Sequence, residues 1–327
     1  MATTFKNFLS NDLANTRTLL HEAIPITGSI ISGTYRDENI KEYGHGMFQS
    51  VYDYPFLSSS ANHIFDITTG IAQGSLLSGS STTMMAKKAN IYNQMAQTLV
   101  GYDTTGSIKK FTQSTGTEIK DAIFINFARL LTKDEIKKGS LTMNFLTGGT
   151  SASLSHKVSI TDHSGSNGYR VDSPAGEYGY LYKDATKDHV IEVGQIYYQA
   201  GIAVLSGGAI FSEGGLAGGG GSEGLLSTGR WGAADSTQKT QTETATGSYA
   251  VFVTGAVLNE LADGTRHRIN NISFNNTTEL NSSIYFCRVN HNDFNYSSNP
   301  TYLSESKIRV KSRSSDAPVS YITTIGM

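Results

Sequence analysis

The sequence predicts a mainly β protein with a few helices (α+β), built from β-sandwich-like blocks with an N-terminal arm and a Gly-rich loop. Only 17% of the 327 residues are charged, against about 25% in average globular proteins, and 34 glycines accompany abundant Ser, Thr and Asn. The 38% apolar content, including 14 Phe and 17 Tyr, is enough to fill cores. Apolar residues alternate with polar ones in several short segments, which is typical of strands. Low charge also suits a subunit that buries surface against neighbours.

The first segment, residues 1–60, shows weak periodicity and is predicted to form an N-terminal arm that gains order from contacts. Within it, the apolar spacing predicts a helix over Asp12–Ala23, ended by Pro25. A mixed α+β domain is expected over residues 61–205. Its clearest helix covers Met84–Val100, where apolar residues form one stripe and Gly101 fits the position just past a helix end.

Several strands are predicted in the same domain. Ala122–Leu131 reads as a buried strand, and Thr132 with Glu135 forms a capping-box pattern that opens a short helical turn closed at Gly139. Leu141, Met143 and Phe145 alternate in the next strand. Further strands are expected within residues 154–160, 169–182 and 189–205.

Residues 206–248 are predicted to be a Gly-rich loop or linker between the mixed domain and a C-terminal β block at 249–327. The loop is either mobile or ordered on a partner, because it also carries apolar residues that a plain flexible linker lacks. Its candidate partner-contact residues are Gly218, Gly219, Gly220, Gly221 and Trp231.

The C-terminal block contains two strand patterns of opposite character. Ile284–Asn290 is rich in apolar residues, so we expect a strand covered on most of both faces, with Cys287 as a buried, inert thiol. In Lys307–Arg313 the alternation is strict, and a third strand is expected at Ser320–Ile325. The cations Lys307, Arg309, Lys311 and Arg313 therefore share one strand face about 7 Å apart.

This basic face has three interpretations. Cationic edge strands discourage edge-to-edge aggregation, which is the most favoured role. Docking to an acidic surface of another subunit comes second. Nucleic-acid binding is the least favoured, because the net charge is −2 and no interleaved basic and aromatic platform is evident.

The motifs of common enzyme classes do not support a reaction centre. Gly219–Gly224 matches the spacing of a dinucleotide-binding loop but neither follows a strand closely nor opens a helix. Histidine spacing does not favour zinc, and a single cysteine excludes an internal disulfide. We therefore expect no catalytic residue, cofactor, metal or small-molecule substrate. No stretch of about 20 apolar residues predicts a membrane span, so we expect a soluble protein folded in a reducing cytoplasm.

Several sequence segments together resemble virion structural proteins of contractile-tailed, T4-like phages of the marine cyanophage type. They are YFCRVNHNDFNYSSNPTY, SKIRVKSR and SYITTIGM near the C-terminus, with QMAQTLVGYD, FINFARLLTKDEIKKGS and VGQIYYQAGIAVL further upstream. They cover about a third of the chain. The similar proteins continue with at least one more strand past the position of Ile325, so the strand predicted there is expected to pair differently or to be completed by another chain.

The resemblance implies a non-enzymatic structural subunit of a tailed-phage virion, made in the host bacterial cytoplasm and placed in the tail or baseplate. Its partners would be other virion structural proteins and further copies of itself, assembled through β surfaces and loops. One alternative is a head–tail neck or capsid-associated protein. The other is a receptor-binding fibre or adhesin, in which the Gly-rich loop and Tyr/Asn-rich turns contact glycans.

Overall fold

The computed structural model describes most of the chain between residues 7 and 287. The described residues are 7–26, 40–52, 63–72, 83–146, 157–162, 168–183, 192–207, 258, 262, 265, 269–287, 303–304 and 307–308. The fold is mainly β with few helices, as predicted. A bilayer-spanning helix is not found in this part of the chain.

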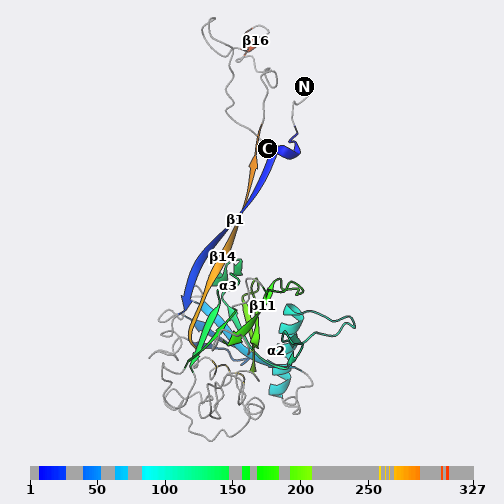
Figure 1. Cartoon of the computed structure of the whole chain (residues 1–327), viewed down its shortest axis with the longest axis vertical. Coiled ribbons are helices and arrows are strands. Elements are labelled where there is room, and N and C mark those ends of the chain that lie inside the picture. Colours follow the sequence, from blue (N-terminus) through cyan, green and yellow to red (C-terminus); the bar gives the residue numbers. More distant parts are fainter. Residues whose placement is uncertain are drawn as a thin grey trace. The chain divides into compact units, whose positions relative to one another are not determined.

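One large sheet organises the protein (Figure 1). Eleven of its twelve strands follow the order β1-β14-β9-β10-β11-β12-β13-β7-β4-β3-β2, and the twelfth, β8, pairs with β14 off this path. The pairs from β14 to β2 are antiparallel. The strands are β1 (Leu13–Ile26), β2 (Ile40–Glu42), β3 (Gln49–Tyr52), β4 (His63–Ile71), β7 (Asp121–Phe127), β8 (Glu135–Ile136), β9 (Thr142–Leu146), β10 (Lys157–Thr161), β11 (Tyr178–Lys183), β12 (Glu192–Tyr197), β13 (Ile202–Ser206) and β14 (Ile269–Tyr285).

Smaller elements accompany the sheet. Two separate hairpins pair β5 (Phe111–Thr112) with β6 (Glu118–Ile119) and β15 (Leu303–Ser304) with β16 (Lys307–Ile308). The helical elements are η1 (Ser10–Asp12), α2 (Thr83–Leu99) and α3 (Arg129–Thr132).

The sheet is apolar on both faces, because its central strands carry apolar residues at consecutive positions. In β7, Ile123, Ile125 and Phe127 pack into one core, whereas Ala122 and Phe124 pack into the other. The first core lies within the curve of the sheet. The second lies between the sheet and α2, with the β5–β6 hairpin at its side.

The first core is enclosed because strands distant in the sheet order face one another. Phe274 of β14 and Phe127 of β7 have ring centroids 5.2 Å apart. The backbone N–H of Ile136, in β8, donates to the carbonyl of Tyr198 just after β12, at 3.0 Å. The sheet therefore bends back on itself, and strands distant in its order together bury one of its faces.

The helix predicted over Met84–Val100 is confirmed as α2. Gly101 follows it with φ +87° and donates its backbone N–H to the carbonyl of Ala96. This is the conformation expected of a glycine just past a helix end. The helix packs closely on β4, since a Cβ atom at Gly70 would lie 2.8 Å from the backbone nitrogen of Tyr92. The small residue in the strand allows this approach.

The helix predicted over Asp12–Ala23 is wrong. This segment is η1 followed by β1, and the side chain of His21 lies 3.2 Å from the hydroxyl of Thr277 in the neighbouring strand β14. Pairing with β14 outweighs the local helical spacing, which propensity alone does not decide. The strand starting at Ala122 is confirmed but ends at Phe127, before the predicted Leu131.

The capping-box prediction at Thr132 is also wrong, because Thr132 ends the helical turn α3 and does not begin one. The next residue, Lys133, has φ +56°, and the chain then enters the short strand β8. The strand predicted at Leu141, Met143 and Phe145 is confirmed as β9, with these three side chains buried.

The residues Ile284, Tyr285, Phe286 and Cys287 are exposed, so the predicted burial of this segment and of its thiol is wrong. Ile284 and Tyr285 end β14, where β1 is the neighbouring strand, and Phe286 and Cys287 follow it. The start of the predicted C-terminal β block, residues 249–257, and the strand predicted at Ser320–Ile325 lie outside the described residues.

The chain divides into two compact units, one of residues 1–18 with 280–327 and one of residues 19–279. β14, from the predicted C-terminal block, is hydrogen-bonded to β9 of the predicted mixed domain. The predicted domain boundaries stay a prediction.

Candidate functional site

The predicted partner-contact residues fall largely outside the described residues. This holds for Gly218, Gly219, Gly220, Gly221, Trp231, Arg309, Lys311 and Arg313. Lys307 begins β16, where its backbone pairs with Ser304 of β15. Within the described residues, no two of the predicted partner-contact side chains are brought together. The basic face stays a prediction.

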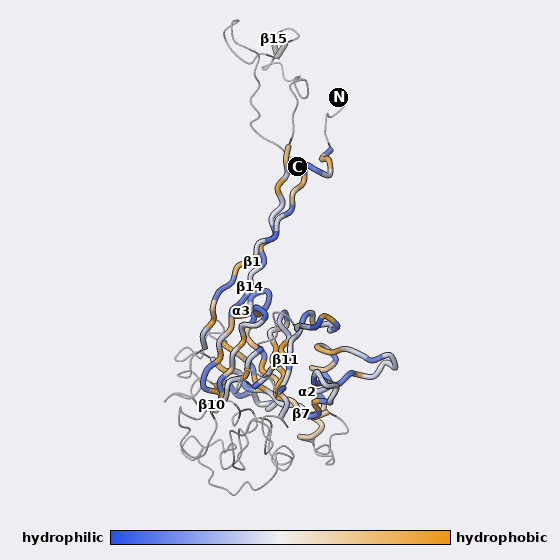
Figure 2. Tube along the Cα trace, viewed as in Figure 1, coloured by the Kyte–Doolittle hydropathy of each residue, from blue (hydrophilic) through white to orange (hydrophobic). Residues whose placement is uncertain are grey.

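A different surface stands out in the unit formed by residues 1–18 and 280–327. Large apolar residues with about half-exposed side chains gather just before η1, at the start of β1, and at the end of β14 and just past it. Parts of these segments are coloured as hydrophobic in Figure 2. We call this surface the ribbon patch; its residues are Phe8, Leu9, Leu13, Leu280, Ile284, Tyr285 and Phe286. Their exposed fractions run from 41% for Leu13 to 60% for Leu9.

Strand geometry explains why the patch has two faces. Side chains alternate along a strand, so Leu280, Ile284 and Phe286 share one face and Tyr285 lies on the other. Tyr285 contacts Phe8, with ring centroids 5.6 Å apart. Among the described residues, none fully covers either face, since each of these side chains keeps 41–60% of its surface exposed.

Hydrogen bonds hold the backbone beneath the patch. The carboxylate of Asp12 accepts the backbone N–H of Leu9 at 2.9 Å, and the carbonyl of Asp12 accepts the N–H of Phe286 at 2.8 Å. Further along, the hydroxyl of Ser283 donates to the side-chain oxygen of Asn15 at 2.7 Å. Polar groups thus fix the chain while apolar groups face water.

The patch is nearly free of charge. Within residues 7–18 and 280–287, the ionisable charges at neutral pH are Asp12, which is buried, and Arg17, which is exposed. A surface of this kind gains little from an oppositely charged partner, and burial of its apolar side chains supplies the attraction.

The strand edges beside the patch are open in the described part of the chain. β1 is the last strand in the sheet order, and β9 and β8 pair with β14 only at positions between Ile269 and Thr277. The outer edges of this part of the ribbon are therefore not paired with another described strand, and strand edges are templates for pairing with another chain.

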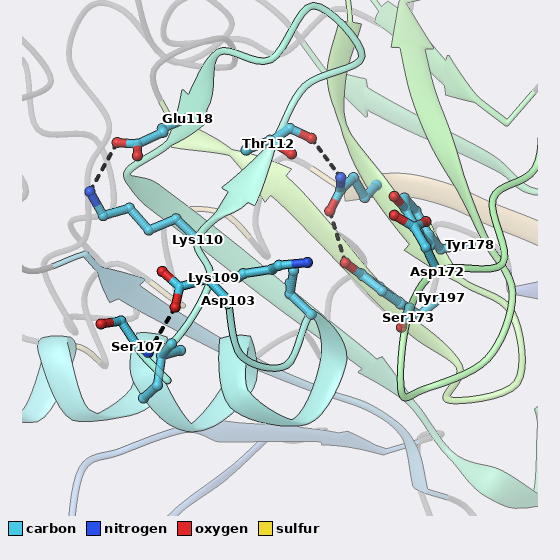
Figure 3. Close-up of a pocket in the computed structure, with 13 residues that line it drawn as sticks. Asp103, Ser107, Lys109, Lys110, Thr112, Glu118, Asp172, Ser173, Tyr178 and Tyr197 are labelled. Atoms are coloured by element: carbon cyan, nitrogen blue, oxygen red, sulfur yellow. Dashed lines mark hydrogen bonds and ion pairs between the residues drawn. The ribbon is translucent and has the colours of Figure 1, made fainter. Parts of the chain in front are cut away.

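The other unit, residues 19–279, contains a cleft of about 550 Å³ (Figure 3). Its walls come from the chain after α2, the β5–β6 hairpin, the loop before β11, and β12. Two tyrosines, Tyr178 and Tyr197, stack inside it with centroids 5.2 Å apart and ring planes 25° apart.

A chain of hydrogen bonds fixes the inner wall of the cleft. The hydroxyl of Tyr197 donates to Gln195 at 3.0 Å, and the amide of Gln195 donates to the carbonyl of Thr112 at 2.7 Å. At the rim, Lys110 and Glu118 form an ion pair at 2.9 Å (Figure 3). The wall therefore presents prearranged polar atoms beside aromatic rings.

The pKa values of the cleft follow from these contacts. Burial raises the pKa of Tyr178 and of Tyr197 well above the usual tyrosine value, so both phenols stay protonated at neutral pH. The hydrogen bond from Lys110 lowers the pKa of Glu118. The geometry suits binding of a neutral polar ligand, whose apolar face can meet the partly exposed ring of Tyr178, while the buried Gln195 holds the wall in place.

Sequence reasoning missed both surfaces. The apolar run at Ile284–Cys287 was visible, but it was interpreted as buried because such runs usually are. The cleft combines five chain segments, from Val100 to Tyr197, that no local motif connects. Among the described residues, no group of three or more His, Cys, Asp or Glu side chains is placed to hold a metal ion.

No protein-family model, curated protein sequence or solved structure matches the chain significantly.

Proposed function

We propose that this chain is a structural subunit of a tailed-phage particle, assembled into the tail or baseplate through its β surfaces. The ribbon patch is the observation that carries an assembly role, since it exposes seven large apolar side chains on a hydrogen-bonded backbone. Several sequence segments resemble virion structural proteins, and this resemblance supports the assignment to a phage particle. Its work is therefore binding to neighbouring subunits.

The size of the patch favours a lasting contact over a passing one. Burying roughly 100 Å² of apolar surface contributes about 2.5 kcal/mol at ~25 cal/mol per Å². The gross gain from seven half-exposed side chains is large enough to offset the entropy lost on association. Large apolar side chains that gather on an exposed surface mark interaction sites in proteins.

The shape of the ribbon gives a second argument. A two-stranded antiparallel ribbon is marginally stable by itself in water, whereas three strands or packing against another element give independent stability. At residues 280–285, β14 has β1 as its neighbour and no further strand among the described ones. A neighbouring subunit would supply the missing cover.

Quantitative mass spectrometry of purified particles tests the proposal. The chain should be present at a fixed copy number, and separation of tails from heads should place it with the tail or baseplate. Recovery with heads or necks would favour the head–tail neck or capsid-associated alternative. Absence from mature particles would overturn the structural role.

The cleft favours one second candidate, a receptor-binding adhesin. Tyrosine rings beside fixed amide and hydroxyl groups suit recognition of a sugar ring. The isolated protein should then bind host cells, and Gln195→Ala should weaken the binding because it removes the amide that fixes the wall. Gln94→Ala, an exposed change on α2, is the matched control. Equal binding by both variants would exclude the cleft as the receptor-binding site.

A further inference from the structure

We infer that the cleft in the unit of residues 19–279 binds a neutral carbohydrate, with a sugar ring against Tyr178 and its hydroxyls paired with Asp172 and Lys109. The inference does not depend on a tail or baseplate role. It rests on the adhesin candidate in treating the cleft as a binding site, and it adds the residues that touch the ligand and the charge of the ligand. Three features carry it: fixed walls, an accessible aromatic ring, and exposed charges of both signs.

The walls of the cleft are held in place by hydrogen bonds between separate segments. The backbone N–H of Ser114, in the β5–β6 hairpin, donates to the carboxylate of Glu192 at the start of β12, at 3.0 Å. The hydroxyl of Ser173, in the loop before β11, donates to the carbonyl of Leu99 at the end of α2. The site is therefore formed before a ligand arrives, and a prearranged site loses less entropy on binding.

Tyr178 offers the aromatic surface of the cleft. One face of its ring stacks on Tyr197, which is 1% exposed, and Tyr180 meets it edge to face with ring centroids 6.0 Å apart. Tyr178 itself is partly exposed and lines the cleft, so the surface that it keeps open lies away from these two contacts. Such a ring suits a ligand with apolar C–H groups on one face and hydroxyls around its edge, as in a pyranose.

Charges of both signs line the cleft. Among the described residues they are Asp103, Glu118 and Asp172 against Lys109 and Lys110, so neither sign is in large excess. Lys110 and Glu118 pair with each other at 2.9 Å. The carboxylate of Asp103 accepts two backbone N–H groups of its own loop, at 2.8 and 2.9 Å. Asp172 and Lys109 are exposed and take part in neither arrangement.

An acid and a base in one cleft favour a neutral ligand that carries hydroxyls. Burial raises the pKa of Tyr178, and the carboxylate of Asp172 raises this pKa further because the two side chains lie beside each other (Figure 3). A sugar hydroxyl can donate to the carboxylate of Asp172 or accept from the ammonium of Lys109, and both hydrogen bonds are charge-assisted. A charged ligand would be repelled by one of the two groups.

Saturation-transfer NMR of the full chain with a panel of free saccharides tests the inference. The panel holds glucose, galactose, mannose and N-acetylglucosamine, together with the uronic acid and the amino sugar of each hexose. At least one neutral saccharide should bind. The counterpart that adds a carboxylate or an ammonium group to the same ring should bind more weakly. Binding confined to charged saccharides, or binding to none of the panel, would overturn the inference.

A conservative change at Asp172 assigns the binding to the cleft. Asp172→Asn should weaken binding of the neutral saccharide by about fivefold, because an amide oxygen is a weaker acceptor than a carboxylate. Asp134→Asn is the matched control, since Asp134 is exposed and does not line the cleft. Equal binding by the two variants would overturn the placement of the ligand beside Asp172.

Changes at Tyr178 separate stacking from hydrogen bonding. Tyr178→Phe keeps the ring and should leave binding within about twofold, whereas Tyr178→Leu removes the ring and should abolish binding. Thermal denaturation shows whether each variant is folded. Asp172→Asn, at an exposed side chain, decides the question if Tyr178→Leu does not fold. Wild-type binding by a folded Tyr178→Leu variant would contradict a sugar on this ring.

These results distinguish failure of the inference from failure of the proposed function. A chain that is present in purified particles but binds no saccharide keeps the structural role and overturns the inference. A chain that binds a neutral saccharide through Asp172 but is absent from particles keeps the inference and overturns the structural role. Saccharide binding without binding to host cells would keep the inference and count against the adhesin candidate.

Discussion

Phe127 of β7 and Phe274 of β14 pack against each other with ring centroids 5.2 Å apart, although β9 to β13 lie between their strands in the sheet. The contact shows how the sheet bends back to enclose its first core. Both rings are 2% exposed, so the contact is internal. β14, which lies next to the edge strand β1, and the central strand β7 thereby belong to one hydrophobic core.

Removing one ring should therefore destabilise the whole sheet. Phe274→Ala is expected to lower the free energy of unfolding by about 3–5 kcal/mol, because it deletes a large buried side chain and leaves a cavity. Urea denaturation measures the change. Leu130→Ala, at a side chain 57% exposed, should cost less than about 0.5 kcal/mol. Comparable losses in the two variants would contradict the closure of the core by Phe274.

Gly194 is required by the close approach of β12 and β13. A Cβ atom there would lie 2.1 Å from the carbonyl oxygen of Val204, which is backbone and cannot turn away. Gly194→Ala should destabilise the protein by roughly 1–3 kcal/mol or more through overpacking. Gly44→Ala has nothing within 4 Å of the added carbon and should be close to neutral. Thermal denaturation of the two variants measures the difference in stability. A neutral Gly194→Ala would refute the predicted clash.

Tyr92 anchors α2 to the β5–β6 hairpin. Its buried hydroxyl donates to the carbonyl of Ile119 and accepts the backbone N–H of Phe111 at 3.2 Å. Tyr92→Phe leaves both groups unpaired, which should cost about 1–3 kcal/mol in chemical denaturation. Tyr102→Phe, at a side chain 52% exposed, is the control and should have little effect. Equal stability of the two variants would show that the hydrogen bonds of the Tyr92 hydroxyl do not stabilise the protein.

Asp162 should make stability depend on pH. Its buried carboxylate accepts the backbone N–H groups of Gly139 at 2.7 Å and Leu141 at 2.8 Å. Burial raises the pKa of Asp162, and these hydrogen bonds offset part of the rise. A raised folded pKa means that the folded state holds the proton more tightly than the unfolded state. Its contribution to stability is thus present at low pH and lost as pH rises from about 3.9 through the folded value.

The comparison with Asp162→Asn isolates this titration. The variant carries a constant penalty, because its amide N–H faces a backbone donor, but it does not titrate. The wild-type advantage in free energy of unfolding should therefore shrink as pH rises across that window. An advantage that grows with pH would mean that the two N–H groups outweigh burial.

Local patterns in the sequence predicted the elements whose partners are close by. The stripe of α2 with Gly101, and the alternation of Leu141, Met143 and Phe145, each follow from one segment and were confirmed. The segment from Asp12 was mistaken for a helix because its partner, β14, lies more than two hundred residues away in the sequence. Local propensity cannot report such pairing.

The candidate sites were harder to predict for a similar reason. Burial of Ile284–Cys287 was expected from apolar content alone, whereas exposure depends on which other elements cover the strand. The stacking of Tyr178 on Tyr197 depends on the register of β11 with β12, which pairs these two residues directly. No motif in either strand encodes that register.

Cross-linking mass spectrometry on intact virions tests the central claim most directly. The proposed function predicts links from lysines such as Lys87 to tail or baseplate subunits. Lys88 should not react, because it is fully buried. Links confined to capsid or portal proteins would move the chain to the head or neck. The absence of this chain from purified particles would contradict the account.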